Sequence, residues 1–318
     1  MTSARLPTQA DRFLGCFLGQ AIGDAVGSPV EGMSAEMIYH FFGDSEALMT
    51  LPGDRQLHYT DDTEMLIGVA QTLLEHGTIV EETLVARFVA NLSPARGYGP
   101  GAIRILQAMS ERRDWRHLTA TIFPGGSYGN GAAMRVAPVG LVFSGDLDRV
   151  WEEARLSSLC THIHPLGIEG AQLLAIAIAW QLQHPVFDSA AMYTELIRRA
   201  TTDEFRWLLS TSASLSIDDS VSILGNGIEA QRSVVTSIAC FALSPDSYVD
   251  SVGRAIGLGG DTDTLAAMTG ALSGAHLGVS ELPAQLVHQL ENGKNGRDVI
   301  AMLAQRLHDR TNSVVESN

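Results

Sequence analysis

The chain has 318 residues, of which 45% are hydrophobic and 31 are glycine, and its formal net charge at pH 7 is −15. This hydrophobic content is enough for a substantial core, although length alone does not decide between one domain and two. The negative charge argues against direct binding to a nucleic-acid backbone or to an anionic membrane surface.

Helical periodicity dominates the chain, and Pro and Gly residues separate many of the segments. The segments expected to be helical are 13–26, 34–43, 63–76, 80–91, 100–110, 131–143, 147–159, 165–183, 188–200, 203–213, 227–243, 246–257, 264–277, 281–289 and 295–309. No convincing strand pattern, repeat or low-complexity linker interrupts them. The sequence predicts a single compact, many-helix, all-α domain over residues 12–310, monomeric, with flexible segments at 1–11 and 311–318.

The first predicted helix, residues 13–26, carries Gly15, Gly19 and Gly23 at four-residue spacing. Residues at this spacing share one helix face, so their small size lets another helix approach closely. Asp24 in the same helix is interpreted as a buried structural acid.

Some loop residues do not by themselves indicate a functional site. Glu31 follows Pro29, which ends the first helix and places Glu31 in a loop, where an acid is usually solvated. The glycine loops at 96–101 and 224–234 are interpreted as plain connections unless they line a shared cleft. Only its relation to the other motifs makes Glu31 a candidate.

The stretch "HYTDDTEMLIGVAQTLLEHG" (58–77) places Thr60, Asp61 and Asp62 just ahead of a helix that Gly77 closes. By itself, this pattern is typical of a helix cap, because Asp and Thr side chains accept hydrogen bonds from free backbone N–H groups.

The stretch "FPGGSYGNGAAMRVAPVGLVF" (123–143) combines glycines with Ser127, Tyr128 and Asn130 before a predicted helix. Its glycines are Gly125, Gly126, Gly129 and Gly131. Glycines let the backbone approach a ligand, and N–H groups at a helix start can bind an anion. No G-K-[ST] follows and no strand precedes, which excludes the Walker and Rossmann patterns. A phosphate site is favoured over a plain turn.

Three cysteines, Cys16, Cys160 and Cys240, lie far apart in apolar surroundings and are interpreted as reduced core residues. Cys160 is followed by His162 and His164, but without a second ligand pair a zinc site is disfavoured. The N-terminal stretch lacks a signal-peptide pattern, and the apolar runs are about half the length that spans a bilayer. We therefore expect a soluble, cytoplasmic protein.

The stretch "GLGGDTDTLAAMTGALSGAHLG" (257–278) begins a helix with Asp261 and Asp263. Residues at i and i+2 of a regular helix point about 200° apart, so these carboxylates can converge only in a loop or an unwound first turn. The preceding Gly257, Gly259 and Gly260 permit such a backbone.

If both acid clusters fold together, their charges need compensation. Two charges about 4 Å apart repel by roughly 4 kcal/mol at an effective dielectric near 20. Carboxylate and hydroxyl oxygens favour a hard divalent ion such as Mg²⁺, Mn²⁺ or Ca²⁺.

Four motifs, "GDAVGSPVE", "YTDDTEM", "GSYGNGAAMR" and "GLGGDTDT", occur in an order that resembles the ADP-ribosylglycohydrolase (ADP-ribosylhydrolase, DraG-like) family over residues 12–290. The resemblance implies an all-α fold with a binuclear Mg²⁺ centre, in which Mn²⁺ is an acceptable substitute. It implies as metal ligands Thr60, Asp61, Asp62, Asp261, Asp263 and Thr264. It implies as substrate-binding residues Glu31, Phe123, Gly125, Gly126, Ser127, Tyr128, Gly129, Asn130, Gly131 and His162.

The resemblance further implies hydrolysis of the C1″ bond of ADP-ribose. Two metals can orient the ribose hydroxyls and lower the pKa of a water, and a nearby carboxylate can transfer a proton. Glu31 is the first candidate for that carboxylate, and Asp62 or Asp261 is the alternative base.

The motifs are more similar to the branch that acts on O-linked (serine) ADP-ribose, poly(ADP-ribose) and O-acetyl-ADP-ribose. The expected partners are accordingly ADP-ribose and ADP-ribosylated proteins or polymer. The alternatives are an arginine-linked ADP-ribose hydrolase, as for dinitrogenase reductase, a non-catalytic ADP-ribose-binding protein, and a metal phosphohydrolase.

Overall fold

The computed structural model describes residues 6–50, 55–217 and 219–315, which form seventeen α-helices and five short 3-10 helices without a named strand. The α-helices are α1 (Gln9–Gly27), α2 (Ala35–Phe42), α3 (Ser45–Met49), α4 (Asp61–His76), α5 (Glu81–Asn91), α6 (Pro100–Ser110), α7 (Trp115–Thr121), α8 (Ala137–Val142), α9 (Leu147–Leu159), α10 (Pro165–Gln183), α11 (Ser189–Arg199), α12 (Asp203–Ala213), α13 (Ala230–Leu243), α14 (Tyr248–Gly257), α15 (Thr262–Leu277), α16 (Ala284–Gln289) and α17 (Arg297–Val315). The 3-10 helices are η1 (Ser28–Val30), η2 (Pro94–Arg96), η3 (Asn130–Ala132), η4 (Val221–Leu224) and η5 (Val279–Glu281). The expected all-α fold is confirmed.

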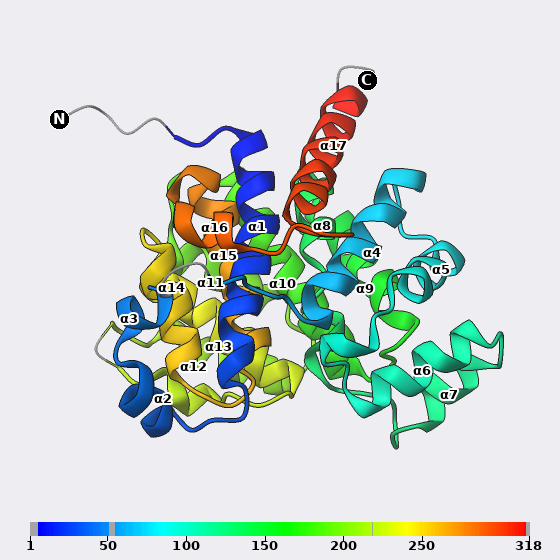
Figure 1. Cartoon of the computed structure of the whole chain (residues 1–318), viewed down its shortest axis with the longest axis horizontal. Coiled ribbons are helices and arrows are strands. Elements are labelled where there is room, and N and C mark those ends of the chain that lie inside the picture. The colour runs from blue at the N-terminus through cyan, green and yellow to red at the C-terminus, as the bar shows by residue number, and fades with distance from the viewer. Residues whose placement is uncertain (1–5, 51–54, 218, 316–318) are drawn as a thin grey trace.

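Helices α1 and α15 pack against each other in the middle of the molecule (Figure 1). A Cβ atom on Gly15, Gly19 or Gly23 would collide with the backbone of α15, and one on Gly270 or Gly274 would collide with the backbone of α1. The glycine spacing in the first helix therefore permits the close helix contact that the sequence predicted.

The remaining large helices surround this pair. Helices α10, α13 and α14 pack on α15, whereas α4 and α17 pack on α1. By length and composition α10 could cross a membrane, but 72% of its apolar window is buried inside the protein. Because the pair is covered, the first turn of α15 begins in the interior, with Thr262, Asp263 and Thr264 all buried.

Two predicted helices are interrupted by proline. The segment 131–143 instead forms η3 and α8, and Pro138 lies in the first turn of α8. The segment 281–289 forms η5 and α16, with Pro283 capping α16. Proline lacks the N–H that a helix interior requires, so each helix starts afresh at the proline.

The ends of the first and last helices differ from the predicted helix bounds. Helix α1 begins at Gln9, because Thr8 and Asp11 form a capping box with both N–H···O distances at 3.1 Å. Helix α17 continues to Val315, beyond the expected boundary at 310. Helices α3 and α7 were missed; they are short, and each begins at an aspartate cap, Asp44 or Asp114.

The three cysteines are free and buried, as expected for core residues.

Candidate active site

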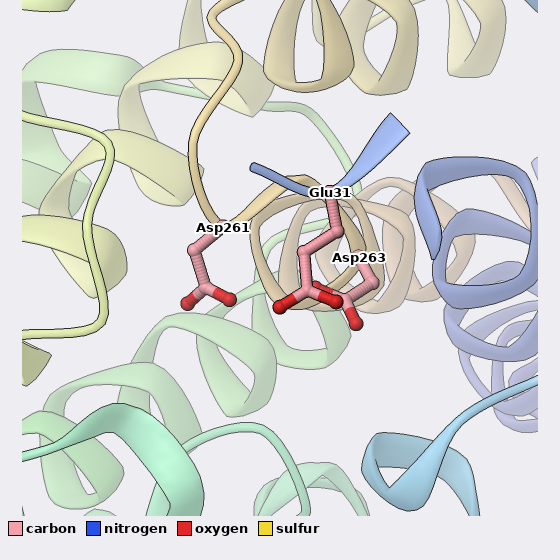
Figure 2. A group of neighbouring side chains, drawn as sticks. All are labelled: Glu31, Asp261 and Asp263. Atoms are coloured by element: carbon pink, nitrogen blue, oxygen red, sulfur yellow. The ribbon is translucent and has the colours of Figure 1, made fainter. Parts of the chain in front are cut away.

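Three carboxylates converge where the loop after α1 meets the start of α15. Glu31, Asp261 and Asp263 each offer an oxygen, and these oxygens lie within 4.8 Å of one another. Figure 2 shows the three side chains directed toward the same point. Asp261 is the residue that precedes the first turn of α15, with φ −84° and ψ 62°, and Asp263 lies inside that turn. The expected convergence of the two aspartates thus occurs.

Backbone hydrogen bonds hold the Glu31 loop against the start of α15. Gly32 N–H donates to Gly260 O at 2.8 Å, and Gly260 N–H donates to Met33 O at 3.0 Å. Gly259 and Gly260 have φ of 71° and 76°, a region that favours glycine. This pairing holds the Glu31 loop close to Asp261.

The second acid cluster, Asp61 and Asp62, lies in the first turn of α4, which is hydrogen-bonded to Asp24 of α1. Asp24 accepts hydrogen bonds from Thr60 N–H at 2.8 Å and from Thr63 N–H at 3.1 Å. Asp62 Oδ2 accepts from the hydroxyls of Thr60 at 3.2 Å and Thr264 at 3.4 Å. Asp62 therefore links the two clusters, and Asp24 has the structural role that the sequence suggested.

Burial changes the acidity of these groups. Desolvation, followed by the charge of neighbouring carboxylates, raises the pKa of Asp263 to about 9 and that of Asp61 to about 7. The same causes raise the pKa of Asp62 well above its ordinary value. Desolvation also raises the pKa of Asp261 to about 6, although a hydrogen bond from Asn130 opposes the rise.

These residues fit a divalent cation. The buried Asp62 Oδ1 has no hydrogen-bond partner among the described residues, which is costly unless a ligand supplies one. The surrounding donors are carboxylate and hydroxyl oxygens, the set that hard divalent ions prefer. A cation between Asp62, Asp261 and Asp263 would also remove the repulsion that raises their pKa values. The cluster could therefore bind metal.

The acids line a cleft with a volume of about 260 Å³. Among the predicted site residues, those that line it are Glu31, Asp61, Asp62, Phe123, Ser127, Gly129, Asn130, Gly131, His162, Asp261, Asp263 and Thr264. Thr60, Gly125, Gly126 and Tyr128 do not line it. The cleft thus brings together most of the predicted metal and substrate residues.

The glycine-rich loop meets the cleft through its second half. Asn130 Nδ2 donates to Asp261 Oδ2 at 2.5 Å, so its side chain orients a carboxylate, and its N–H donates to Ile228 O at 2.9 Å. Gly126, with φ 90°, turns the chain against Ile163. Tyr128 is 49% exposed and lies outside the cleft.

His162 lines the cleft, and a chain of hydrogen bonds connects its ring to the buried Arg135. Arg135 Nη2 donates to Thr161 Oγ1 at 2.8 Å, and that hydroxyl lies 2.8 Å from His162 Nδ1. The opposite edge of the ring lies against the glycine loop, where a Cβ on Gly131 would be 3.4 Å from Nε2.

A second pocket, of about 490 Å³, adjoins the cleft and shares Glu31 and Gly97 with it. Its lining residues are Ser28, Glu31, His58, Tyr59, Thr60, Ser93, Ala95, Arg96, Gly97 and Glu291. The predicted ligand Thr60 therefore faces this second pocket.

The fold and the site together define an all-α protein with an acidic, metal-compatible cleft. A model of the ADP-ribosylglycohydrolase family matches residues 5–315. The chain belongs to the ADP-ribosylglycohydrolase family and is a glycosyl hydrolase.

Individual relatives agree with this assignment. The chain is 33% identical to ADP-ribosylhydrolase ARH3 of Homo sapiens over 343 residues, covering 93% of each protein. It is 32% identical to ADP-ribosylhydrolase ARH3 of Danio rerio, covering 94% of this chain and 90% of that protein. A chain of a solved ADP-ribosylglycohydrolase-related protein complex has the same fold, with a TM-score of 0.73 at 23% identity, covering 95% of this chain and 99% of that one.

Some site residues escaped sequence reasoning. Arg135 and Thr161 line the cleft and were not predicted as site residues, although Arg135 belongs to the motif GSYGNGAAMR. Gly97, Gly99 and Gly101 also line it, although their loop was interpreted as a plain connection. The R-G-Y-G-P-G spacing was the available signal, since glycines permit a close backbone approach.

Proposed function

We propose that this protein cleaves the C1″ bond of O-linked ADP-ribose with two bound Mg²⁺ ions, or Mn²⁺ in their place. Its substrates would be serine-modified proteins, poly(ADP-ribose) and O-acetyl-ADP-ribose. The observation that carries the proposal is the convergence of Glu31 with Asp261 and Asp263 in the lining of a cleft. The relatives named ADP-ribosylhydrolase supply the substrate class, and the motif similarity described above supplies the O-linkage.

The positions of the residues suggest a separate role for each of them in the reaction. Glu31, on an exposed loop beside the buried aspartates, is placed to give a proton to the departing oxygen or to take one from water. Asp62 and Asp261 are the alternative bases. Asn130 and Thr264 orient these aspartates through hydrogen bonds. When bound, two divalent ions would orient the ribose hydroxyls and lower the pKa of a nearby water. The rest of the cleft, from Ser127 to His162, would hold the diphosphate and adenosine.

The test is Glu31→Gln with a serine-ADP-ribosylated peptide and Mg²⁺. Because the amide cannot transfer the proton, turnover should fall by roughly 10²–10⁴-fold. ADP-ribose affinity, measured by calorimetry, should change far less. EDTA should abolish turnover by the wild type, and Mg²⁺ or Mn²⁺ should restore it.

Product analysis separates the alternatives. The proposal predicts free ADP-ribose as product; a phosphohydrolase would release AMP and ribose phosphate, and a binding protein would release nothing. Full turnover in chelator, or unchanged turnover by Glu31→Gln, would contradict the proposed mechanism.

A further inference from the structure

The second pocket, defined above by its ten lining residues, shares part of its lining with the cleft. Glu31 lines both, and so does Gly97. If ADP-ribose occupies the cleft with its C1″ atom beside Glu31, the group on the other side of the scissile bond faces the second pocket. This step rests on the proposed function.

Arg96, Glu31 and Glu291 are the Arg and Glu residues among the described residues that line this pocket. Its guanidinium donates to Tyr59 O at 2.7 Å, stacks 3.8 Å from the centre of the Tyr59 ring and is ion-paired with Glu291 through both terminal nitrogens. The Arg96 side chain is only 17% exposed. Of the described residues that line the pocket, Arg96 is the one permanent cation.

Glu291 is the carboxylate that a cationic leaving group would need. Besides Arg96, it accepts a hydrogen bond from Tyr59 N–H at 3.2 Å and lies 3.3 Å from His58 Nδ1. Burial acts to raise the pKa of Glu291, but the hydrogen bond and charge of Arg96, with the hydrogen bonds of His58 and Tyr59, together lower that pKa below its ordinary value. Its oxygens are therefore already occupied.

We infer that the second pocket receives the leaving group and that Arg96 makes it select against cationic leaving groups. A guanidinium prefers a bidentate carboxylate, and here Arg96 already occupies Glu291 through both of its terminal nitrogens. A serine leaving group is neutral and therefore does not need a carboxylate partner in the pocket. Arg96 is thus a specificity-determining residue for O-linked over arginine-linked ADP-ribose.

The test compares Arg96→Gln with Glu291→Gln on two peptides that differ only in whether serine or arginine carries the ADP-ribose. Both substitutions break the same salt bridge, but they change the pocket charge in opposite directions. Arg96→Gln frees Glu291 for the guanidinium and should raise the arginine-to-serine ratio of kcat/KM on the order of tenfold. Glu291→Gln leaves Arg96 uncompensated and should lower that ratio by a similar factor. Arg96→Lys, which keeps the charge, should behave like the wild type.

The same ratios are measured as affinities by calorimetry in the Glu31→Gln background, which needs no turnover. Failure of the wild type to cleave either peptide would contradict the proposed function, whereas the affinity ratios would still test the pocket. Ratios that shift the same way in both variants, as simple loss of structure would give, or that do not shift, would overturn the role of Arg96.

Discussion

The hydrogen bonds of His162 determine what its ring offers to the cleft. Because Thr161 Oγ1 accepts from Arg135, its own hydrogen is free to go to His162 Nδ1, the nearest acceptor at 2.8 Å. With the hydroxyl hydrogen directed at Nδ1, the imidazole proton would be on Nε2, the edge that faces the glycine loop. Burial, reinforced by the positive charge of Arg135, lowers the pKa of His162 to about 3. The ring is therefore a neutral N–H donor throughout the physiological range.

This arrangement predicts that Thr161→Val weakens substrate binding. Without the hydroxyl, the ring loses the partner that fixes its tautomer, which is worth roughly 0.5–1.5 kcal/mol or about 2–12-fold. The KM for an ADP-ribosylated peptide should rise by that factor with kcat nearly unchanged, and Thr161→Ser should retain the wild-type KM. Equal effects of the two substitutions, or a fall in kcat alone, would contradict the assigned role of Thr161.

At the residue scale, local chemistry made part of the site predictable. Asp261 and Asp263 cannot converge on a regular helix, so their spacing already implied an unusual backbone and a ligand. Asn130 belonged to a glycine-rich motif, but its contact with Asp261 spans 131 positions and no local pattern encodes it. Tyr128 was expected in the cleft for its motif alone, and the turn at Gly126 carries it outside.

Among the elements, the contact between α1 and α15 decides where the acids lie. Its glycines bring the helix backbones together, and the loop that follows α1 then meets the start of α15. Periodicity predicted most helices well, since it reports a buried face. It failed at α8 and α16, where proline ends one hydrogen-bond ladder and begins another.

Gly19→Ala should separate helix propensity from packing. In an exposed helix this change would stabilise by about 1 kcal/mol. Here the new methyl group would meet the backbone of Gly270 and lie 3.2 Å from the Tyr248 ring, so we expect a net destabilisation of about 1–3 kcal/mol, measured by urea unfolding. Gly145→Ala, where a Cβ meets nothing within 4 Å, is the matched control and should change stability by less than about 1 kcal/mol. A Gly19→Ala variant more stable than the wild type would show that the contact between α1 and α15 is loosely packed.

For the whole molecule, the buried acids tie stability to pH and to metal. The pKa of Asp263 is 3.8 in an unfolded chain and about 9 in the metal-free fold, and the pKa of Asp61 rises to about 7. The folded state therefore binds more protons than the unfolded state. The resulting stability is fully present below pH 3.8 and is lost progressively as pH rises toward 9.

We predict that Asp263→Asn is more stable than the wild type in EDTA, because the amide avoids a buried negative charge. The difference in melting temperature should grow between pH 5 and pH 9. Saturating Mg²⁺ should reverse the order, since a ligand that binds only the folded wild type stabilises it by mass action. Differential scanning calorimetry at fixed ionic strength is the measurement. An EDTA difference that does not depend on pH would contradict the linkage to Asp263.

The pairing of α1 with α15 has a consequence for synthesis on the ribosome. Roughly 250 residues separate the two helices, so at about 5–20 residues per second α1 emerges about 12–50 s before its partner exists. Glu31 and Asp62 are likewise made long before Asp261 and Asp263. The contact between α1 and α15 and the convergence of the acids therefore become possible at the same late stage of synthesis.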